Sequence, residues 1–125
     1  MSASKVKNYH VCVFCGSKPG NNKKFIDVAN KLGEELSKKK YTVIYGGGSL
    51  GLMGALANGV LKNNGKLISI IPSSLKNNNI LSAKPFKTIH TKDFVERKKL
   101  MIKKATIFIV LPGGFGTLDE FFEVI

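Results

Sequence analysis

The sequence predicts an α/β fold with a parallel sheet of about five strands. Short apolar segments of strand length alternate with longer segments whose apolar residues recur at helical spacing. This alternation is typical of β-α-β units, in which parallel strands are joined by right-handed crossovers. Glycine-rich stretches follow the strands. They are therefore expected at one edge of the sheet, beyond the carboxyl ends of the strands, where ligands bind in this fold class.

The first half of the chain contains two strand–helix units. The apolar run His10–Cys15 predicts the first strand, and the second, Tyr41–Tyr45, ends at three consecutive glycines. Leu52–Leu61 is apolar on most faces, which predicts a buried helix. The helix between the two strands, Lys24–Lys38, has its apolar residues at helical spacing. These residues are Phe25, Val28, Ala29, Leu32 and Leu36.

The second half continues the alternation. A third strand is expected at Lys66–Ile71, a weaker fourth at Phe86–His90 and a strongly apolar fifth at Thr106–Leu111. The second, third and fifth strands are nearly continuous apolar runs, as expected when helices cover both faces of a sheet. A further helix is expected to begin near Thr117. Phe94–Lys104 predicts a helix whose inward residues are Val95, Leu100 and Met101.

The composition is that of one ordinary globular domain spanning residues 1–125, with 43% hydrophobic and 22% charged residues. No apolar run reaches the ~20 residues that cross a bilayer. The N-terminus lacks the apolar segment of a signal peptide, so a cytoplasmic location without membrane contact is expected. The apolar helical pattern at Phe121–Ile125 has no stop signal, which indicates a domain that is incomplete at its C-terminal end.

The net charge of +12 favours anionic partners. The lysines are scattered along the chain, however, and Arg97 is its one arginine. Proteins that read DNA sequence use arginine for bidentate contacts with bases. Nucleic-acid binding is therefore disfavoured, and we attribute the charge to solubility and a lysine-rich composition.

Cys12 and Cys15 have the C-x-x-C spacing of many redox and metal sites. Both lie in one predicted strand, where residues three apart point to opposite faces of the sheet. The sequence therefore predicts two reduced, buried thiols. We expect no metal and no cofactor.

The first glycine-rich segment, Gly46–Gly51, matches G-x-G-x-x-G between a predicted strand and a predicted helix. Glycines let backbone N–H groups approach a phosphate at a helix N-terminus. A tight strand-to-helix turn is the simpler alternative. Dinucleotide binding would also need an acidic residue about 20 positions on. No Asp or Glu occurs from Leu36 to Lys92, which disfavours NAD and leaves a phosphate or a mononucleotide.

The second segment, Pro112–Glu120, places three glycines within four residues after an apolar strand. Thr117 is suited to cap the next helix and to donate its hydroxyl to a phosphate. Asp119 and Glu120 then fall in the first helical turn. They either complement the helix dipole or act in chemistry. We favour the second role, because carboxylates beside a phosphate loop are electrostatically costly.

Arg97 follows the fourth strand, close to the same edge of the sheet. One alternative places it on a solvated helix face, paired with Asp93 or Glu96. A planar guanidinium is well suited to a forked contact with an anion, and we favour that role.

Together these segments resemble the LOG ("lonely guy") family, also labelled as possible lysine decarboxylases. The family signatures are C-G-S after a strand, G-G-G-x-x-G-L-M-G, an R-K pair before a methionine, and P-G-G-x-G-T-x-x-E. In this chain they stand, in family order, as Cys15–Ser17, Gly46–Gly54, Arg97-Lys98 with Met101, and Pro112–Glu120. Where the family usually carries Met-His, this chain has Phe94-Val95, and family acidic residues are replaced near Asn79 and at Thr106.

The resemblance implies a Rossmann-like, three-layer α/β/α homodimer that hydrolyses the N-glycosidic bond of AMP or an N6-modified AMP, such as a cytokinin riboside 5′-monophosphate. It implies Arg97 and Glu120 as the catalytic pair. The carboxylate would stabilise an oxocarbenium-like state and activate water. A decarboxylase would need a lysine for pyridoxal phosphate, for which the sequence gives no separate argument. The implied nucleotide-binding residues are Gly16, Ser17, Gly46, Gly47, Gly48, Gly51, Met53, Lys98, Gly113, Gly114, Gly116, Thr117 and Asp119.

Two alternatives stay open. In the first, the chain is a non-catalytic module of the same fold that binds a nucleotide or a cofactor, since relatives that carry molybdenum cofactor share this style of loop. The weaker alternative is nucleic-acid binding through charge, because loops similar to P-G-G-x-G-T also occur in DNA-processing proteins of related fold.

Overall fold

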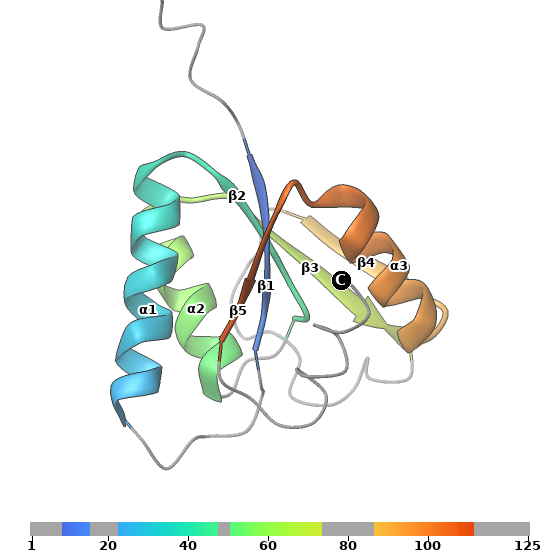
Figure 1. Ribbon diagram of the computed structural model, residues 1–125, viewed down its shortest axis with the longest axis horizontal. Coiled ribbons are helices and arrows are strands. Elements are labelled where there is room, and N and C mark those ends of the chain that lie inside the picture. The colour runs from blue at the N-terminus through green and yellow to red at the C-terminus, as the bar shows by residue number, and fades with distance from the viewer. Residues whose placement is uncertain (1–8, 16–22, 48–50, 74–86, 112–125) are drawn as a thin grey trace, which may run out of the picture.

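The computed structural model describes residues 9–15, 23–47, 51–73 and 87–111 (Figure 1). Every element in these ranges is one that the sequence predicted, with ends shifted by at most one residue. The helix expected near Thr117 lies outside the described residues. The elements are β1 (His10–Phe14), α1 (Lys23–Lys38), β2 (Thr42–Tyr45), α2 (Gly51–Lys62), β3 (Leu67–Pro72), β4 (Lys87–Thr91), α3 (Phe94–Lys104) and β5 (Ile107–Val110).

The strands form one parallel sheet in the order β4-β3-β2-β1-β5. The chain therefore adds strands in one direction from β1 to β4 and then returns to the other side of β1. The change of direction falls between β1 and β5, where Val11 pairs with Ile107. Because all strands are parallel, their carboxyl ends lie at the same edge of the sheet, at the bottom of Figure 1.

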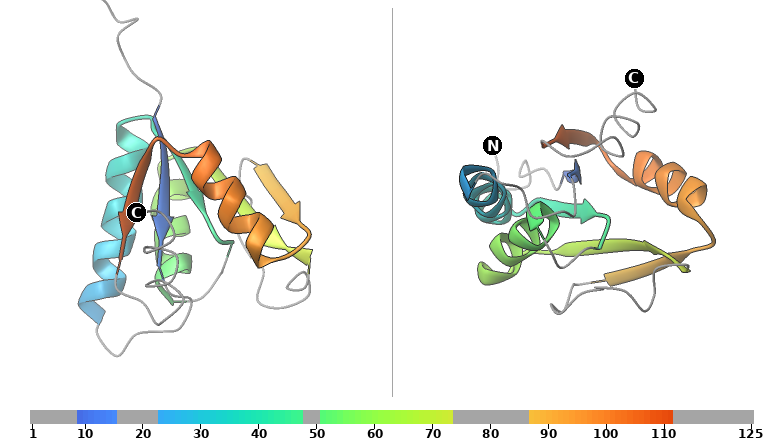
Figure 2. Two further views of the ribbon diagram at one scale, coloured as in Figure 1. Left: turned by 45° about the vertical axis from the view of Figure 1, so that its right-hand side comes forward. Right: turned by 90° about the horizontal axis from the view of Figure 1, so that it is seen from below.

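Helices α1 and α2 cover one face of the sheet, and α3 lies over the other, so the predicted three-layer fold is confirmed (Figure 2). The larger core cluster lies under α1 and α2. The two helices approach closely at two glycines, where a Cβ on Gly33 would lie 2.9 Å from the Val60 amide nitrogen and one on Gly59 would lie 3.1 Å from the Glu34 amide nitrogen. Contact between helix backbones needs residues without side chains at the crossing.

The smaller core cluster lies between the sheet and α3. It contains Cys12, Phe14, Ile44, Ile68, Ile70 and Met101, of which α3 supplies only Met101. The rings of Phe14 and Phe108 stack nearly parallel with their centroids 6.1 Å apart, which joins β1 to β5 on this face. In the part of the chain that the structure describes, one helix with one buried apolar side chain therefore covers this face.

Two expectations about burial are wrong. Val95 was expected inward and is 57% exposed, because the buried side of α3 runs through Arg97 and Met101. Phe25 and Val28 of α1 are also exposed. The buried side of α1 is instead formed by Ala29, Gly33, Leu36 and Ser37.

The second concerns β5, whose side chains are only partly buried although the strand is nearly continuously apolar. It is the edge strand beside β1 in the described sheet, so neighbouring strands shield it on one side only. The predicted burial of α2 is confirmed. Its apolar side chains are largely covered within the single chain.

The two cysteines are reduced, buried and assigned to opposite faces of the sheet. Cys12 belongs to the core cluster on the α3 side and Cys15 to the one on the α1/α2 side, as the strand periodicity predicted. Within the described ranges, no helix is both long and apolar enough to cross a membrane.

Candidate functional site

The candidate site lies at the carboxyl edge of the sheet. Strand β2 ends at Tyr45, and Gly46 and Gly47 continue from it. Beside it, β1 ends at Phe14, whose carbonyl accepts a hydrogen bond from the Leu111 amide at 2.8 Å. The ends of β1 and β5 are therefore neighbours at the change of direction in the strand order, where ligands bind in open α/β sheets.

Two glycines after β2 adopt backbone conformations that favour glycine. Gly47 has φ of 89° and Gly51 has φ of 60°. A Cβ on Gly47 would also lie only 2.5 Å from Cγ1 of Ile71, so a larger residue is excluded by space as well as by conformation. Gly51 opens α2, so the N-terminus of this helix follows the glycine-rich segment in the sequence.

Arg97 brings a cation to this turn from the other side of the sheet. Its side chain is 9% exposed, and Nη1 donates a hydrogen bond to the Gly46 carbonyl at 3.3 Å. A Cβ on Gly46 would lie 2.9 Å from Nη1 of Arg97 and 3.3 Å from Cε of Met53. Three residues predicted for the site, from the end of β2, from α2 and from α3, therefore lie close together.

The start of α3 fixes where Arg97 lies. Asp93 caps the helix, because its carboxylate accepts a hydrogen bond from the Glu96 amide at 2.9 Å. Glu96 in turn accepts one from the Lys92 amide at 3.2 Å. Both carboxylates bond to the helix start, and Arg97 is buried. The alternative that placed Arg97 on a solvated face is therefore wrong.

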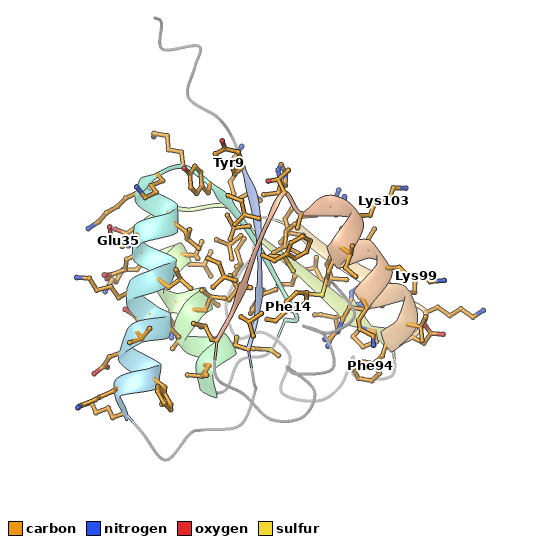
Figure 3. The ribbon with its side chains drawn as sticks, in the orientation of Figure 1. Tyr9, Phe14, Glu35, Phe94, Lys99 and Lys103 are labelled. Carbon is orange, nitrogen blue, oxygen red and sulfur yellow. The ribbon has the colours of Figure 1, made fainter. Side chains whose placement is uncertain are left out.

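Phe94 is a neighbour of Arg97 that the sequence argument did not assign to the site. The Arg97 guanidinium carbon lies 5.0 Å from the centroid of the Phe94 ring, and Phe94 is 47% exposed. Figure 3 shows Phe94 at the end of α3 nearest the carboxyl edge, with Lys99 and Lys103 on the outer side of the helix. The i, i+3 spacing of Phe94 and Arg97 was the available signal.

Two buried hydroxyls lie beneath the same edge. Tyr45 and Ser69 pair in register on β2 and β3, and both are fully buried. Burial raises the pKa of the Tyr45 phenol to about 12, with a smaller opposing effect from the nearby Ser69 hydroxyl. Among the described residues, neither hydroxyl makes a hydrogen bond of good geometry. Tyr45 therefore stays neutral at physiological pH.

The remaining predicted residues divide between two groups. Lys98 follows Arg97 on α3 and is half-buried. Gly16, Ser17, Gly48, Gly113, Gly114, Gly116, Thr117, Asp119 and Glu120 lie outside the described residues.

The described part of the site is electropositive. Arg97 and the N-terminus of α2 supply positive charge, and the first turn of α2 contains no acidic residue. Within residues 9–15, 23–47, 51–73 and 87–111, no group of three His, Cys, Asp or Glu side chains is placed to hold a metal ion. The arrangement is suited to a small anion such as a phosphate group.

Sequence comparisons identify the relatives of this chain. Residues 53–125 match the family model described as "Possible lysine decarboxylase". The chain is 42% identical over 115 residues to "Probable cytokinin riboside 5′-monophosphate phosphoribohydrolase LOGL9" of Oryza sativa subsp. japonica, covering 92% of this chain and 51% of the relative. It is 40% identical over 125 residues to cytokinin riboside 5′-monophosphate phosphoribohydrolase LOG5 of Arabidopsis thaliana, covering 100% of this chain and 55% of the relative. The chain thus spans about half the length of these curated relatives.

Solved structures agree on the fold. The structural-genomics target TM1055 superposes with a TM-score of 0.76 at 28% identity, over 93% of this chain and 68% of that chain. The molybdenum cofactor binding protein of Rippkaea orientalis superposes with a TM-score of 0.81 at 22% identity, over 94% of this chain and 71% of that chain. The second likeness concerns the fold alone. The family match and the relatives together show that this chain belongs to the LOG family, also described as possible lysine decarboxylases.

Proposed function

We propose that the protein hydrolyses the N-glycosidic bond of an adenosine 5′-monophosphate, with or without a substituent on N6, to the free base and ribose 5-phosphate. Its curated relatives carry the name cytokinin riboside 5′-monophosphate phosphoribohydrolase. The observation that supports the same chemistry in this chain is the buried Arg97 guanidinium against the Gly46 carbonyl, beside a glycine-rich helix start.

Binding follows from the charge and backbone of this edge. The amides of the glycine-rich turn and the N-terminus of α2 would hold the 5′-phosphate. Arg97 would contact the phosphate or ribose, or stabilise the leaving base. Binding energy from the phosphate, which does not react, would then orient the glycosidic bond.

Water would attack C1′ of the ribose, and the C1′–N9 bond would break through an oxocarbenium-like state. Its electron pair leaves with the base, which takes up a proton. Glu120 is the carboxylate proposed to stabilise this state and to accept the proton of water. Asp119 is its neighbour and the next candidate.

Two substitutions test these roles. Glu120→Gln keeps the size of the side chain and removes its charge, so base release should fall by about 10²-fold or more while AMP affinity stays similar or improves. Arg97→Lys keeps the charge and loses the planar fork, so it should weaken both binding and rate. The measurements are single-turnover release of free base from AMP and N6-substituted AMP, and calorimetric AMP binding.

The outcomes separate enzyme from binding module. If the parent binds AMP and releases no base, the function is non-catalytic binding of a nucleotide or a cofactor. If Glu120→Gln retains most activity, the catalytic carboxylate lies elsewhere. NAD should raise the melting temperature less than AMP does, and equal shifts would contradict the mononucleotide assignment. A homodimer and a cytoplasmic location remain predictions.

A further inference from the structure

The first turn of α3 carries two neighbouring exposed apolar side chains, Phe94 at 47% and Val95 at 57% exposure. Their relation to Arg97 differs. Residues three apart on a helix lie on the same side, and residues two apart do not. Phe94 is therefore placed to face Arg97, and the guanidinium carbon lies 5.0 Å from its ring centroid.

We propose that Phe94 is a positioning residue, which holds the plane of the Arg97 guanidinium against the Gly46 carbonyl so that a bound nucleotide meets a cation already oriented. The role of Arg97 toward the nucleotide rests on the proposed function. The orientation of Arg97 by Phe94 rests on the contacts within this chain alone.

The direction of side chains in a helix supports this role. Long side chains lean toward the helix N-terminus, so Arg97 is directed back over the turn that contains Phe94. Asp93 caps α3 directly before Phe94 and fixes where that turn begins. The ring and the guanidinium are therefore brought together by the helix start, and the same geometry directs Nη1 toward Gly46.

The hydrogen bond to Gly46 and the ring fix different parts of Arg97. At 3.3 Å the bond is longer than the usual 2.9–3.0 Å, and it fixes the position of one nitrogen. A ring face attracts the whole cation and limits rotation of its plane. Gly46 supports the same position, because a Cβ there would lie 2.9 Å from Nη1. A planar fork that is oriented before the ligand arrives loses less conformational freedom on binding.

The test compares Phe94→Leu, Phe94→Tyr and Val95→Leu in the 125-residue chain. Phe94→Leu removes the ring and keeps an apolar side chain, Phe94→Tyr restores a ring, and Val95→Leu is the matched control at the next exposed position. Arg97 is the one arginine of this chain, so its Nε–H signal in a ¹⁵N NMR spectrum needs no further assignment.

Phe94→Leu should shift the Arg97 Nε–H signal, because the ring current is lost, and lower its heteronuclear NOE, because the side chain moves more. Phe94→Tyr should keep both values near those of the parent, and Val95→Leu should leave them unchanged. In the base-release assay, Phe94→Leu should lower kcat/KM about two- to fivefold, with Phe94→Tyr near the parent and melting temperatures unchanged.

An unchanged Nε–H signal in Phe94→Leu would overturn the proposal, and so would a Phe94→Tyr variant that behaves like Phe94→Leu. If the parent releases no base, the proposed function fails, and the NMR signal together with calorimetric AMP affinity still decides the role of Phe94. If Phe94→Leu and Val95→Leu lower the heteronuclear NOE and kcat/KM equally, the effect is a general one on α3, and the proposal is also contradicted.

Discussion

The two faces of the sheet differ in how they are covered. On one face, α1 and α2 pack so closely that Gly33 and Gly59 lie at their crossing, and most of α2 is buried. On the other face, α3 is the one helix within the described residues, and its buried residues are Met101 and the charged Arg97. The first face is a dense apolar layer, and the second is a thin layer that holds a cation at the carboxyl edge. Core packing therefore concentrates on one face, while the second face carries the group suited to bind an anion.

This difference has a physical cause. A buried guanidinium is costly unless its N–H groups have partners, and the Gly46 carbonyl supplies one. The position of α3 is therefore tied to a polar contact at its first turn as well as to packing at Met101. The buried residues of α1 and α2 include no charged side chain, and the two helices are held by close packing together with a hydrogen bond from the Asn30 side chain to the Ala55 carbonyl at 3.2 Å. We expect substitutions on the two faces to have different consequences.

The largest effect is expected for Gly59→Ala on the dense face. The new Cβ would lie 3.0 Å from the Asn30 carbonyl carbon and closer still to its oxygen, and backbone cannot rotate away. Overpacking of this kind should lower the free energy of unfolding by about 3 kcal/mol. Urea denaturation measures it, with Asn58→Ala at the exposed neighbouring position as a near-neutral control. A Gly59→Ala variant as stable as Asn58→Ala would show that the helices can separate at little cost.

A smaller loss is expected for Met101→Ala on the thin face. Met101 is 1% exposed and is the apolar side chain by which α3 enters the core. Removal of such a side chain costs about 2–5 kcal/mol, and we expect about 2 kcal/mol because a single helix can shift toward the sheet.

The same denaturation experiment on Met101→Leu, which nearly conserves volume, should show a loss below about 1.5 kcal/mol. If Met101→Ala is more destabilising than Gly59→Ala, the thin face contributes as much to stability as the dense one, and the comparison fails.

The smallest effect concerns an ion pair that joins α1 to α2 at the surface. Nζ of Lys62 lies 2.6 Å from Oε2 of Glu34, and this bond lowers the pKa of the Glu34 carboxyl from its ordinary value of 4.5. A lowered folded-state pKa contributes stability above the unfolded value, and the contribution is lost as the pH falls from 4.5 through the folded pKa. Glu34→Gln should therefore lower the melting temperature slightly at pH 7 and not at low pH.

Glu35→Gln is the matched control for this pair. Glu35 pairs with Lys38 at 3.5 Å within α1 and joins no second helix. The melting temperature of the Glu35→Gln variant should stay at that of the parent across the same pH range. If Glu34→Gln lowers the melting temperature equally at all pH values, the ion pair is not the cause. If the ion pair is the cause, high salt should remove the difference in melting temperature between the variant and the parent.

The sequence predicted the elements well because their signals are local. A five-residue apolar run such as β1, or three glycines after β2, marks a strand or a turn whatever surrounds it. The choice between two faces of one helix is less local. Phe25 and Val28 fit an apolar stripe as well as Ala29 and Leu36 do, and only the position of α2 beside Gly33 leaves the first two exposed.

The sequence by itself determined the order of strands and helices along the chain, the glycine turn at Gly46 and Gly47, and the membership of the LOG family. The tertiary structure alone decided that β5 lies beside β1, and that Arg97 reaches Gly46 from 51 residues away with Phe94 against its guanidinium. The physical reason is that periodicity and backbone preference act over a few residues. Contacts between distant residues depend instead on strand register and on how each helix crosses the sheet.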